Sequence, residues 1–453
     1  MNDHDSERLA GALVADGLVA TADLESADVV VFNTCCIREN ADNKFYGHLG
    51  NLKALRERRP DMQIAVGGCL AQMDGERIRE RASHVDVVFG THNLTRAPAL
   101  LRQAAASGPV VEILDEPLPF SDPTAGDQQA ALAAVRDLPY AAWVTIQTGC
   151  DNSCAFCIVP SVRGGEVSRP RDDLVSEVRA LAGRGVTEVT LLGQNVNSYG
   201  RDLTRRRPLF ADLLRAVGAV DGIRRVRFTS PHPKDLRPET IAAMAETPQV
   251  CNHLHLPLQS GSDATLAAMR RGYTAARYLA RLAEARAAIP DLAVTTDLIV
   301  GFPGETDDDF ERTLEVVAEA SYDSTYTFIF SPRPGTRAAS MADRFVPADV
   351  VADRSTTIRS RSKRSALARH RARIGRVEEV VVEGPSRRDP SLTTGRTGQN
   401  KLVHFPPVDG CPAASGSFAE VHVTGAGRHH LTGELLAVTA RPSHRVRIRV
   451  ASG

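Results

Sequence analysis

Three features that would assign a protein to a compartment or a class of partner are missing from this sequence. No apolar run approaches the length of a membrane span, so no transmembrane helix is predicted. The first residues lack the basic and then apolar pattern of a secretory signal peptide. The formal net charge is zero, because 55 Lys and Arg balance 55 Asp and Glu. A balanced total does not exclude nucleic acid, since local clusters of charge decide that. We expect a cytoplasmic protein without a membrane partner.

Cysteine is sparse but unevenly placed. Eight cysteines in 453 residues, three of them close together, indicate metal chemistry in a reducing compartment rather than a disulfide framework. Cys150, Cys154 and Cys157 follow an apolar segment, residues 142–146, that reads as a strand. Structural zinc normally takes four ligands, so a trio favours a centre with one open position, such as a cubane iron–sulfur cluster. The alternatives are a zinc loop completed by a distant residue and three unligated buried cysteines.

A chain of this length predicts two or three domains. Residues 1–113 alternate helical and strand patterns, which indicates a parallel sheet covered on both faces. Cys35 and Cys69 each follow a predicted strand by two or three residues, so they are expected at one edge of the sheet, where they could share a metal. The alternative is two unrelated buried residues. Strands are predicted at 29–32, 64–66 and 85–89, and helices near 6–16, 38–58, 72–81 and 94–105.

Residues 114–138 read as a linker, and six strand-then-helix units follow it. Eight units would close a barrel, so six leave it open on one side. The cysteine trio follows the first of these strands, at the end of the barrel where active sites lie. A capping box at Thr306 predicts the start of a helix. The strands are predicted near 143–147, 188–192, 224–229, 252–256, 294–300 and 325–330, and helices include 172–183 and 275–289.

Polar or glycine clusters follow four of the six strands, at residues 192–195, 229–232, 257–262 and 297–305. Any one of them is an ordinary turn, but four converging on one face predict a cofactor pocket. We interpret the three histidines near these strands as packing or pocket residues rather than metal ligands; they are His232, His253 and His255.

The C-terminal third begins with a basic stretch. Residues 354–376 hold nine Lys or Arg and no acid. On a helix this is either a solvated face or, against an RNA substrate, a phosphate-contact surface. Short alternating strands separated by glycine and proline then predict a small antiparallel barrel. These strands are expected at 379–382, 402–405, 419–424 and 431–437, before an arginine-rich tail, 441–453.

Several runs resemble one family. Residues 149–169, GCDNSCAFCIVPSVRGGEVSR, resemble the signature of the radical S-adenosylmethionine (SAM) methylthiotransferases. NTCCIRENA and GGCLAQ resemble the two cysteine motifs of that family's N-terminal domain. The position and pattern of the last strands resemble its TRAM domain. The resemblance implies an α/β fold: an N-terminal doubly wound α/β domain lacking its first strand, a central open (β/α)6 three-quarter TIM barrel and a C-terminal TRAM barrel. The implied domains are 1–113, a linker 114–138, a radical SAM domain 139–372, TRAM 373–440 and the tail 441–453.

The resemblance also implies cofactors and their ligands. Cys150, Cys154 and Cys157 would bind one [4Fe-4S] cluster, whose open iron holds SAM, and Cys35 and Cys69 would bind a second. The third ligand of the second cluster belongs just before Met1, so we expect an internal start and a longer working protein. The roles of Cys36, Cys251 and Cys411 are left open. The strand-end residues expected to line the SAM pocket are Gly193, Gln194, Asn195, Ser230, Gln259, Ser260 and Gly301.

The runs NTCCIRENADNKFYG, LLGQNVNSYG and FTSPHP favour the tRNA branch of this family. The implied reaction replaces the hydrogen on carbon 2 of N6-(dimethylallyl)adenosine, beside the anticodon, with a methylthio group. One SAM gives the methyl group and another the radical. The implied partners are tRNA and an electron donor such as flavodoxin or ferredoxin, acting on a monomer. The alternatives are a methylthiotransferase acting on a ribosomal-protein aspartate or on threonylcarbamoyl-adenosine in tRNA, and a non-catalytic RNA-binding relative.

Overall fold

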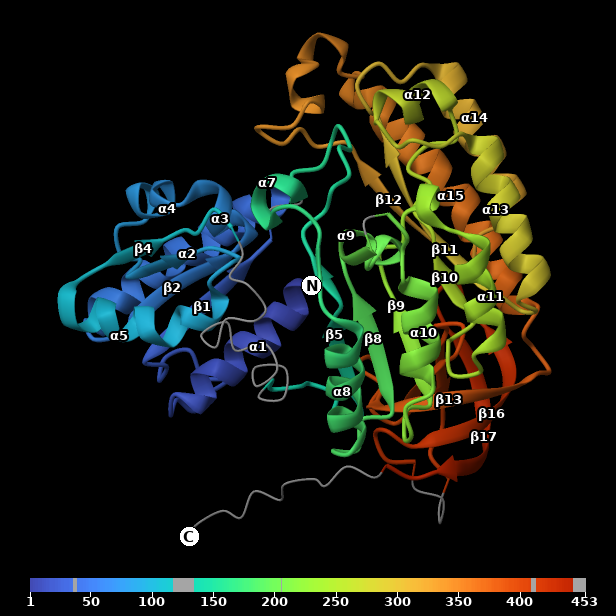
Figure 1. Ribbon diagram of the computed structural model, residues 1–453, viewed down its shortest axis with the longest axis horizontal. Helices are drawn as coiled ribbons and strands as arrows, with labels where there is room; N and C mark the ends of the chain where they lie inside the picture. Colours follow the sequence, from blue (N-terminus) through green and yellow to red (C-terminus); the bar gives the residue numbers. More distant parts are fainter. Residues whose placement is uncertain (36–38, 117–133, 205, 409–412, 443–453) are drawn as a thin grey trace. The chain divides into compact units, whose positions relative to one another are not determined.

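The computed structural model describes residues 1–35, 39–116, 134–204, 206–408 and 413–442. The chain divides into two compact units. Unit 1 consists of Met1–Arg136, Gln147–Arg169 and Ser331–Ala339, and unit 2 of Asp137–Ile146, Pro170–Phe330 and Ser340–Gly453. Within the described residues, no helix is long and apolar enough to cross a membrane. Figure 1 labels many of the helices and strands of the two units.

Unit 1 contains a parallel sheet in the order β1-β2-β3-β4. One face is covered by a cluster that includes Leu49, Ile64 and Ile78, and the other by a cluster that includes Leu9 and Phe89. The covered parallel sheet predicted for the N-terminal region is therefore confirmed. Its strands are β1 (Val29–Thr34), β2 (Gln63–Gly68), β3 (Val87–Phe89) and β4 (Val110–Glu112), and its helices are α1 (Asn2–Ala15), α2 (Glu39–Arg58), α3 (Cys69–Asp74), α4 (Glu76–Arg81), η1 (Leu94–Arg96) and α5 (Ala97–Ser107).

Three details of this sheet differ from the prediction. The helix expected over 72–81 is two helices, α3 and α4, which meet at Gly75. Gly75 has φ +48° and ψ −118°, a backbone conformation that no helix continues through. The three-residue strand β4 is too short to produce a periodic pattern, and it was not predicted. Strands β1 and β2 run further than expected, so Cys35 and Cys69 follow their last residues directly.

Unit 2 contains the predicted open barrel of six parallel strands. Its two three-stranded sheets, β5-β8-β9 and β10-β11-β12, are joined by a parallel bridge between Val226 and Val250. Thr306 forms the predicted capping box with Asp309. The strands are β5 (Ala141–Thr145), β8 (Glu188–Leu192), β9 (Arg225–Phe228), β10 (His253–His255), β11 (Ala293–Val300) and β12 (Ser324–Ile329). The helices are α8 (Arg171–Ala182), α9 (Arg201–Thr204), α10 (Phe210–Gly218), α11 (Pro238–Glu246), α12 (Asp263–Ala268), α13 (Ala275–Ala288), α14 (Asp307–Ala320) and α15 (Ala348–Arg371). Short turns of 3-10 helix are η2 (Val196–Ser198), η3 (Pro233–Asp235), η4 (Ala338–Ser340) and η5 (Ala342–Arg344).

A closed five-stranded barrel ends the described chain, in the order β13-β14-β15-β17-β16. Strand β14 was not predicted, because Thr393–Thr397 contains no alternating apolar residues. The pair β15–β17 is parallel, whereas we expected antiparallel pairs throughout. The strands are β13 (Val377–Pro385), β14 (Thr393–Thr397), β15 (Leu402–Phe405), β16 (Phe418–Ala426) and β17 (Leu431–Ala440).

Buried cations fix the small barrel to the parallel barrel within unit 2. Arg225 donates to the Arg396 carbonyl at 2.6 Å, and Arg227 donates to the Thr397 carbonyl at 2.9 Å. The Lys401 ammonium lies 2.6 Å from the carboxylate of Asp323, and both side chains are buried. Because a charge of each kind is enclosed there, each requires the other.

This pair yields a prediction about stability. Replacing Lys401 by Met should lower the free energy of unfolding by about 3–5 kcal/mol, because the Asp323 carboxylate is left buried without its cation. Urea unfolding measures the loss. Adding Asp323→Asn should recover part of it, since the uncharged amide oxygen can still accept from the Val294 N–H. A Lys401→Met variant as stable as the parent would show that the Lys401–Asp323 ion pair does not stabilise the fold.

Candidate active site

The loop that carries the cysteine trio is closed at its base. Strands β6 (Gln147–Thr148) and β7 (Val167–Ser168) pair antiparallel, and the Cys150 N–H donates to the Gly164 carbonyl at 3.0 Å. Gly149 has φ +70°, and a Cβ added there would lie 1.8 Å from the Gly165 oxygen. Only glycine fits that position, so the crossing of the two loop ends depends on it.

The three thiols lie in the first turns above this base. Cys150 is buried, and Cys154 and Cys157 are half-buried. The Cys157 N–H donates to the Cys154 carbonyl at 3.1 Å, and the Cys157 sulfur accepts from the Val159 N–H at 3.5 Å. Burial raises the pKa of the Cys150 thiol, and hydrogen bonds from Asn152 oppose that shift. Backbone N–H groups directed at sulfur are the contacts that tune iron–sulfur ligands.

The loop contains helix α7 (Val159–Arg163), which packs on the N-terminal sheet inside unit 1. Ile158 and Val162 belong to the same apolar cluster as Cys69. Thr91 also donates to the carbonyl of Val162, at 2.5 Å. The trio's loop and the sheet of residues 1–113 are therefore parts of one compact unit.

The other two predicted thiols lie at adjacent strand ends. Thr34 and Gly68 are paired residues of β1 and β2, so Cys35 and Cys69 are the next residues on neighbouring strands. Gly68 has φ +95°, and a Cβ there would meet the Thr34 carbonyl at 2.4 Å. The two strand ends can approach closely because this residue is glycine. This is the shared sheet edge that the sequence predicts.

Arg163 connects the two sets of cysteines, and sequence reasoning missed it. Its guanidinium lies 2.7 Å from the Asp5 carboxylate and also hydrogen-bonds the Cys69 thiol. Burial alone would lower the pKa of Arg163, but Asp5 and Cys69 raise it above its ordinary value. A charged residue inside the cysteine-motif run was the signal available in the sequence. Its partner Asp5 is 158 residues away, so no local pattern identifies the pair.

No group of three or more His, Cys, Asp or Glu side chains in the described ranges gathers where it could hold a single metal ion. An iron–sulfur cluster requires a different arrangement of ligands from a single metal ion, because each thiolate binds its own iron and the sulfurs surround the cluster. The donor type and the N–H contacts to sulfur around Cys150 and Cys157 fit that group. Cys36 and Cys411 lie outside the described residues. Cys251 is buried in unit 2 beside Arg227, far in sequence from either set.

The predicted SAM-pocket residues form a row along the carboxyl ends of four barrel strands. The row begins after β8 with Gly193, Gln194 and Asn195, whose amide donates to Asp235 at 2.8 Å. The Val196 N–H then donates to the carbonyl of Ser230, after β9, at 3.4 Å.

Gln259 continues this row after β10. It exchanges backbone hydrogen bonds of 2.9 Å with Asp297 and Ile299 of β11. Ser260 beside it is fully buried and contacts the Thr313 hydroxyl at 3.2 Å. The strand ends are thus joined by backbone contacts, and the side chain of Ser260 is used for packing.

Two members of the row are strained. Ser230 has φ +61° and Gln259 has φ +68°, values that non-glycine residues adopt uncommonly. The Gln259 Oε1 atom is buried and accepts no hydrogen bond from any residue that the structure describes. A buried amide oxygen without a donor is costly, so a polar ligand at this position would stabilise it. This observation fits a polar cofactor such as SAM.

Gly301 closes the row after β11. Its N–H donates to the Glu305 carboxylate at 2.7 Å, and Arg354 of α15 binds the same carboxylate at 2.9 Å. Burial raises the pKa of Glu305, while these two donors oppose the shift. A Cβ at Gly301 would lie 2.5 Å from Val351 of the same helix. The turn is therefore set by contacts with α15.

The three histidines, which the sequence predicts as packing or pocket residues, each contact neighbouring protein groups. Burial lowers the pKa of His232 to about 2, and its ring accepts from the Lys234 N–H at 3.2 Å. His253 and His255 both contact the Thr295 hydroxyl, at 3.1 and 2.9 Å.

Comparison with known proteins decides the family. The radical SAM superfamily matches residues 144–317, the TRAM domain residues 371–436, and a family described as uncharacterised, UPF0004, residues 1–90. The tRNA-2-methylthio-N6-dimethylallyladenosine synthase of Acidothermus cellulolyticus is 53% identical over 434 residues, covering 95% of this chain and 85% of that protein. Synthase 1 of Mycobacterium marinum is 50% identical, covering 95% of this chain and 83% of that protein. The chain belongs to the tRNA-2-methylthio-N6-dimethylallyladenosine synthase family.

A solved structure supports the fold of this family member. The radical SAM methyltransferase TsrM of Kitasatospora setae, with cobalamin and a [4Fe-4S] cluster bound, aligns with a TM-score of 0.54 and 14% identity. The alignment covers 74% of this chain and 71% of that one. At this identity the likeness concerns the fold alone. The family resemblance, the three-part α/β architecture and the radical SAM assignment drawn from the sequence are confirmed.

The closed loop of this synthase-family chain yields a second prediction. Replacing Gly149 by Ala should open the crossing of the loop ends, because the new methyl group collides with the Gly165 carbonyl. The Cys150 thiol, buried in the parent, should then react faster with an alkylating reagent, as followed by mass spectrometry of its peptide.

Gly17→Ala is the matched control. Gly17 also has a positive φ, +99°, but a Cβ there meets nothing within 4 Å. Its alkylation rate at Cys150 should equal that of the parent. Equal rates in all three proteins would show that Gly149 does not hold the loop closed.

Proposed function

We propose that this chain methylthiolates carbon 2 of N6-(dimethylallyl)adenosine beside the anticodon of tRNA. The observation that carries the proposal is the intact thiol trio on a closed loop that directly follows the first strand of an open six-stranded barrel. About half of the chain's residues are identical to those of proteins bearing that synthase name, along nearly its whole length. Residues 1–113, 139–372 and 373–440 would be its three domains, joined by 114–138 and followed by the tail 441–453.

Cys150, Cys154 and Cys157 would hold a [4Fe-4S] cluster. When bound, this group supplies the electron that starts radical chemistry on SAM. The chain's own residues have other tasks. The paired strands β6 and β7 close the base of the loop that carries the three thiols, and the Val159 N–H stabilises negative charge on the Cys157 sulfur.

The strand-end row would hold SAM. Gln259 offers a buried amide oxygen to a donor on the cofactor. The backbone bonds of Ser230 and Gln259 to the neighbouring strand ends hold this part of the row in place. Glu305 acts through Gly301, because its carboxylate fixes the N–H of the turn. Gly193, Gln194, Asn195 and Ser260 would complete the pocket.

Cys35 and Cys69 would hold a second [4Fe-4S] cluster. Two observations support this second site. The register of β1 with β2 sets Cys35 and Cys69 side by side at the strand ends. The positive charge of the Arg163 guanidinium also favours a thiolate at Cys69. The remaining features of the proposal are a flavodoxin or ferredoxin as electron donor, a monomeric state and a cytoplasmic location.

Cleavage of SAM tests the trio. Anaerobically reconstituted protein should convert SAM to 5′-deoxyadenosine, and Cys154→Ala should abolish that product, because one iron of the cluster loses its protein ligand. Cys251→Ala is the control, since Cys251 is a buried cysteine of unit 2 that belongs to neither set, and it should retain cleavage. SAM cleavage by Cys154→Ala at the rate of the parent protein would refute the assignment of radical SAM chemistry to the trio.

Iron content tests the number of clusters. Replacing Cys150, Cys154 and Cys157 together by Ala should remove about four irons per chain and leave the rest. Replacing Cys35 and Cys69 by Ala should remove the irons that the trio variant retains. If the trio variant retains no iron, the chain holds one cluster, and the proposal of a second is wrong.

Product analysis tests the substrate. Protein expressed from the native gene and incubated with tRNA that carries N6-(dimethylallyl)adenosine should yield its 2-methylthio derivative by nucleoside mass spectrometry. Transfer instead to threonylcarbamoyl-adenosine or to a ribosomal-protein aspartate would refute this assignment and leave the methylthiotransferase class in place.

A further inference from the structure

Two arginines of the basic stretch belong to the fold rather than to a binding surface. Arg354 is buried and lies 2.9 Å from Glu305 and 2.6 Å from Asp307. Arg373 is buried and lies 2.8 Å from Asp291 and 2.6 Å from Glu378. Their charges are matched by carboxylates, so they attract no further anion.

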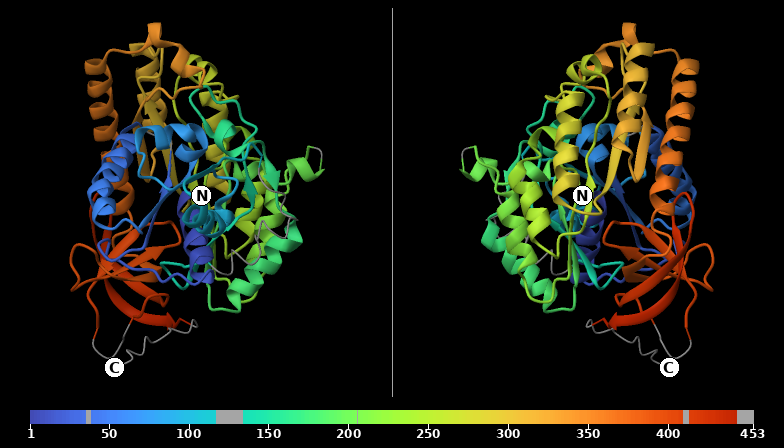
Figure 2. Two further views of the ribbon diagram at one scale, coloured as in Figure 1. Left: turned by 90° about the vertical axis from the view of Figure 1, so that its left-hand side faces the viewer. Right: turned by 90° about the vertical axis from the view of Figure 1, so that its right-hand side faces the viewer.

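The exposed cations of α15 face a groove. The groove has a volume of about 470 Å³. Its α15 side chains recur at helical spacing on one face of the helix, which runs beside α14 (Figure 2). Lys363 and Arg364 are exposed and pair with no acidic side chain in the described part of unit 2. The lining residues are Thr356, Arg359, Ser360, Lys363, Arg364, Leu367 and Arg428.

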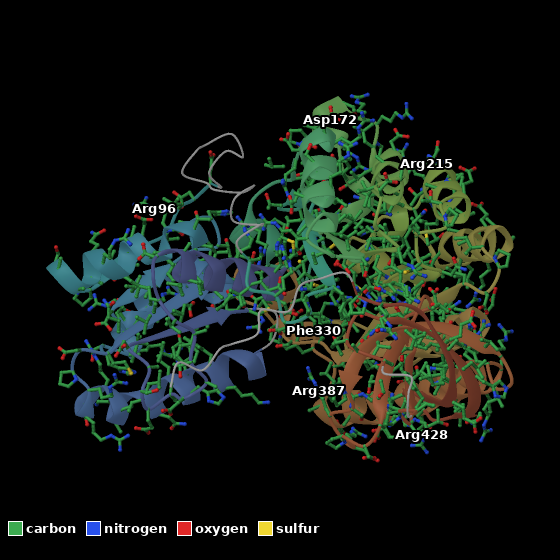
Figure 3. All side chains as sticks on the ribbon, turned by 90° about the horizontal axis from the view of Figure 1, so that it is seen from below. Arg96, Asp172, Arg215, Phe330, Arg387 and Arg428 are labelled. Atoms are coloured by element: carbon green, nitrogen blue, oxygen red, sulfur yellow. The ribbon has the colours of Figure 1, made fainter. Side chains whose placement is uncertain are left out.

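Arg428 comes from a different element, the turn between β16 and β17. Figure 3 shows it on the C-terminal barrel. The turn is closed by a bond from the Gly427 N–H to the His430 carbonyl at 2.8 Å. The buried His370 of α15 donates from Nδ1 to the Gly427 carbonyl, also at 2.8 Å. Because His370 links helix and turn, Arg428 has a fixed position opposite the cations of α15.

The lining has the composition of a phosphate site. Four of its seven side chains are cationic, two are hydroxyls, and none of those that the structure describes there is acidic. Cations held together without acids repel one another, and a bound polyanion removes that repulsion. Guanidinium, ammonium and hydroxyl groups are the usual partners of phosphate oxygens. None of the seven described side chains that line the groove is an aromatic ring able to stack on a base, so the groove suits a backbone rather than a nucleobase.

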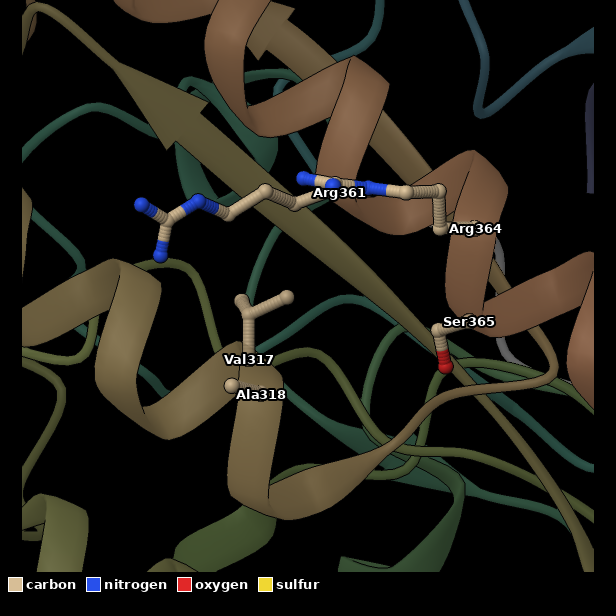
Figure 4. Close-up of a pocket in the computed structure, with 5 residues that line it drawn as sticks. All are labelled: Val317, Ala318, Arg361, Arg364 and Ser365. Carbon is tan, nitrogen blue, oxygen red and sulfur yellow. The ribbon is translucent and has the colours of Figure 1, made fainter.

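A second hollow of about 290 Å³ continues this surface toward α14. It is lined by Arg361, Arg364 and Ser365 of α15 together with Val317 and Ala318 of α14. Figure 4 shows Arg361 and Arg364 extending from α15 in the same direction. Arg364 lines both hollows, which gives the surface room for consecutive phosphates of one strand.

We propose that α15 and the β16–β17 turn form a groove that binds the sugar-phosphate backbone of tRNA. This inference rests on the proposed function, which supplies the RNA. The groove binds without reading sequence, and it anchors the substrate through the helix whose Arg354 also holds the Gly301 turn through Glu305.

The test compares two triple variants of the full, reconstituted protein. The groove variant carries Arg359→Ala, Lys363→Ala and Arg428→Ala. The charge-matched control carries Lys53→Ala, Arg179→Ala and Arg312→Ala, all exposed and outside the groove. Binding of an unmodified tRNA transcript is followed by fluorescence anisotropy over a range of salt concentrations. The groove variant should bind more weakly, and its slope of log affinity against log salt should fall by about one per lost phosphate contact.

Activity measurements distinguish a failure of the groove proposal from a failure of the proposed function. With substrate tRNA, the groove variant should show a raised KM for tRNA, and its cleavage of SAM without tRNA should equal that of the parent and the control. If the parent methylthiolates tRNA while the groove variant keeps the parent's affinity and salt slope, the groove is not a tRNA site and the proposed function stands. Equal losses in both variants would assign the effect to overall charge and refute the groove. A parent that neither binds nor modifies tRNA refutes both.

Discussion

The closed base of the cysteine loop is the constraint on which the candidate site depends. The loop ends cross at Gly149, where the backbone of Gly165 leaves no room for a side chain. The pairing of β6 with β7 then fixes where the thiols begin, and the turn from Cys154 to Cys157 fixes their spacing. A site built on a closed loop is preorganised, so little conformational freedom is lost when a cofactor binds.

Arginine performs two tasks in this protein, and burial separates them. Where the guanidinium is enclosed, as at Arg163 and Arg354, a carboxylate lies within 3 Å and the pair holds elements together. Where it is exposed, as at Arg364 and Arg428, none of the described side chains that line its groove is acidic. A net charge of zero for the whole sequence hides this division, because the total counts enclosed and exposed arginines alike.

The sequence predicted the features that arise from local pattern. The six barrel strands, the capping box at Thr306 and the position of Cys35 and Cys69 at one sheet edge follow from periodicity and strand order. The family runs supplied the architecture of the rest. The cofactor roles of the thiols and of the strand-end row stay predictions, since they depend on groups that bind to the chain.

What the sequence did not predict depends on tertiary contacts or on very short elements. The break at Gly75 and the strand β14 leave no periodic signal. Arg163 meets Asp5 only because α7 packs on the N-terminal sheet. The nine cations of residues 354–376 look alike in sequence, and only the structure shows that Arg354 and Arg373 are enclosed.

Nucleoside mass spectrometry of tRNA from a strain lacking this gene tests the central claim most directly. The account predicts that 2-methylthio-N6-(dimethylallyl)adenosine disappears, that N6-(dimethylallyl)adenosine accumulates in its place, and that the parent gene restores the modification while a Cys154→Ala gene does not. Unchanged levels of the methylthio nucleoside in the deletion strain would contradict the account.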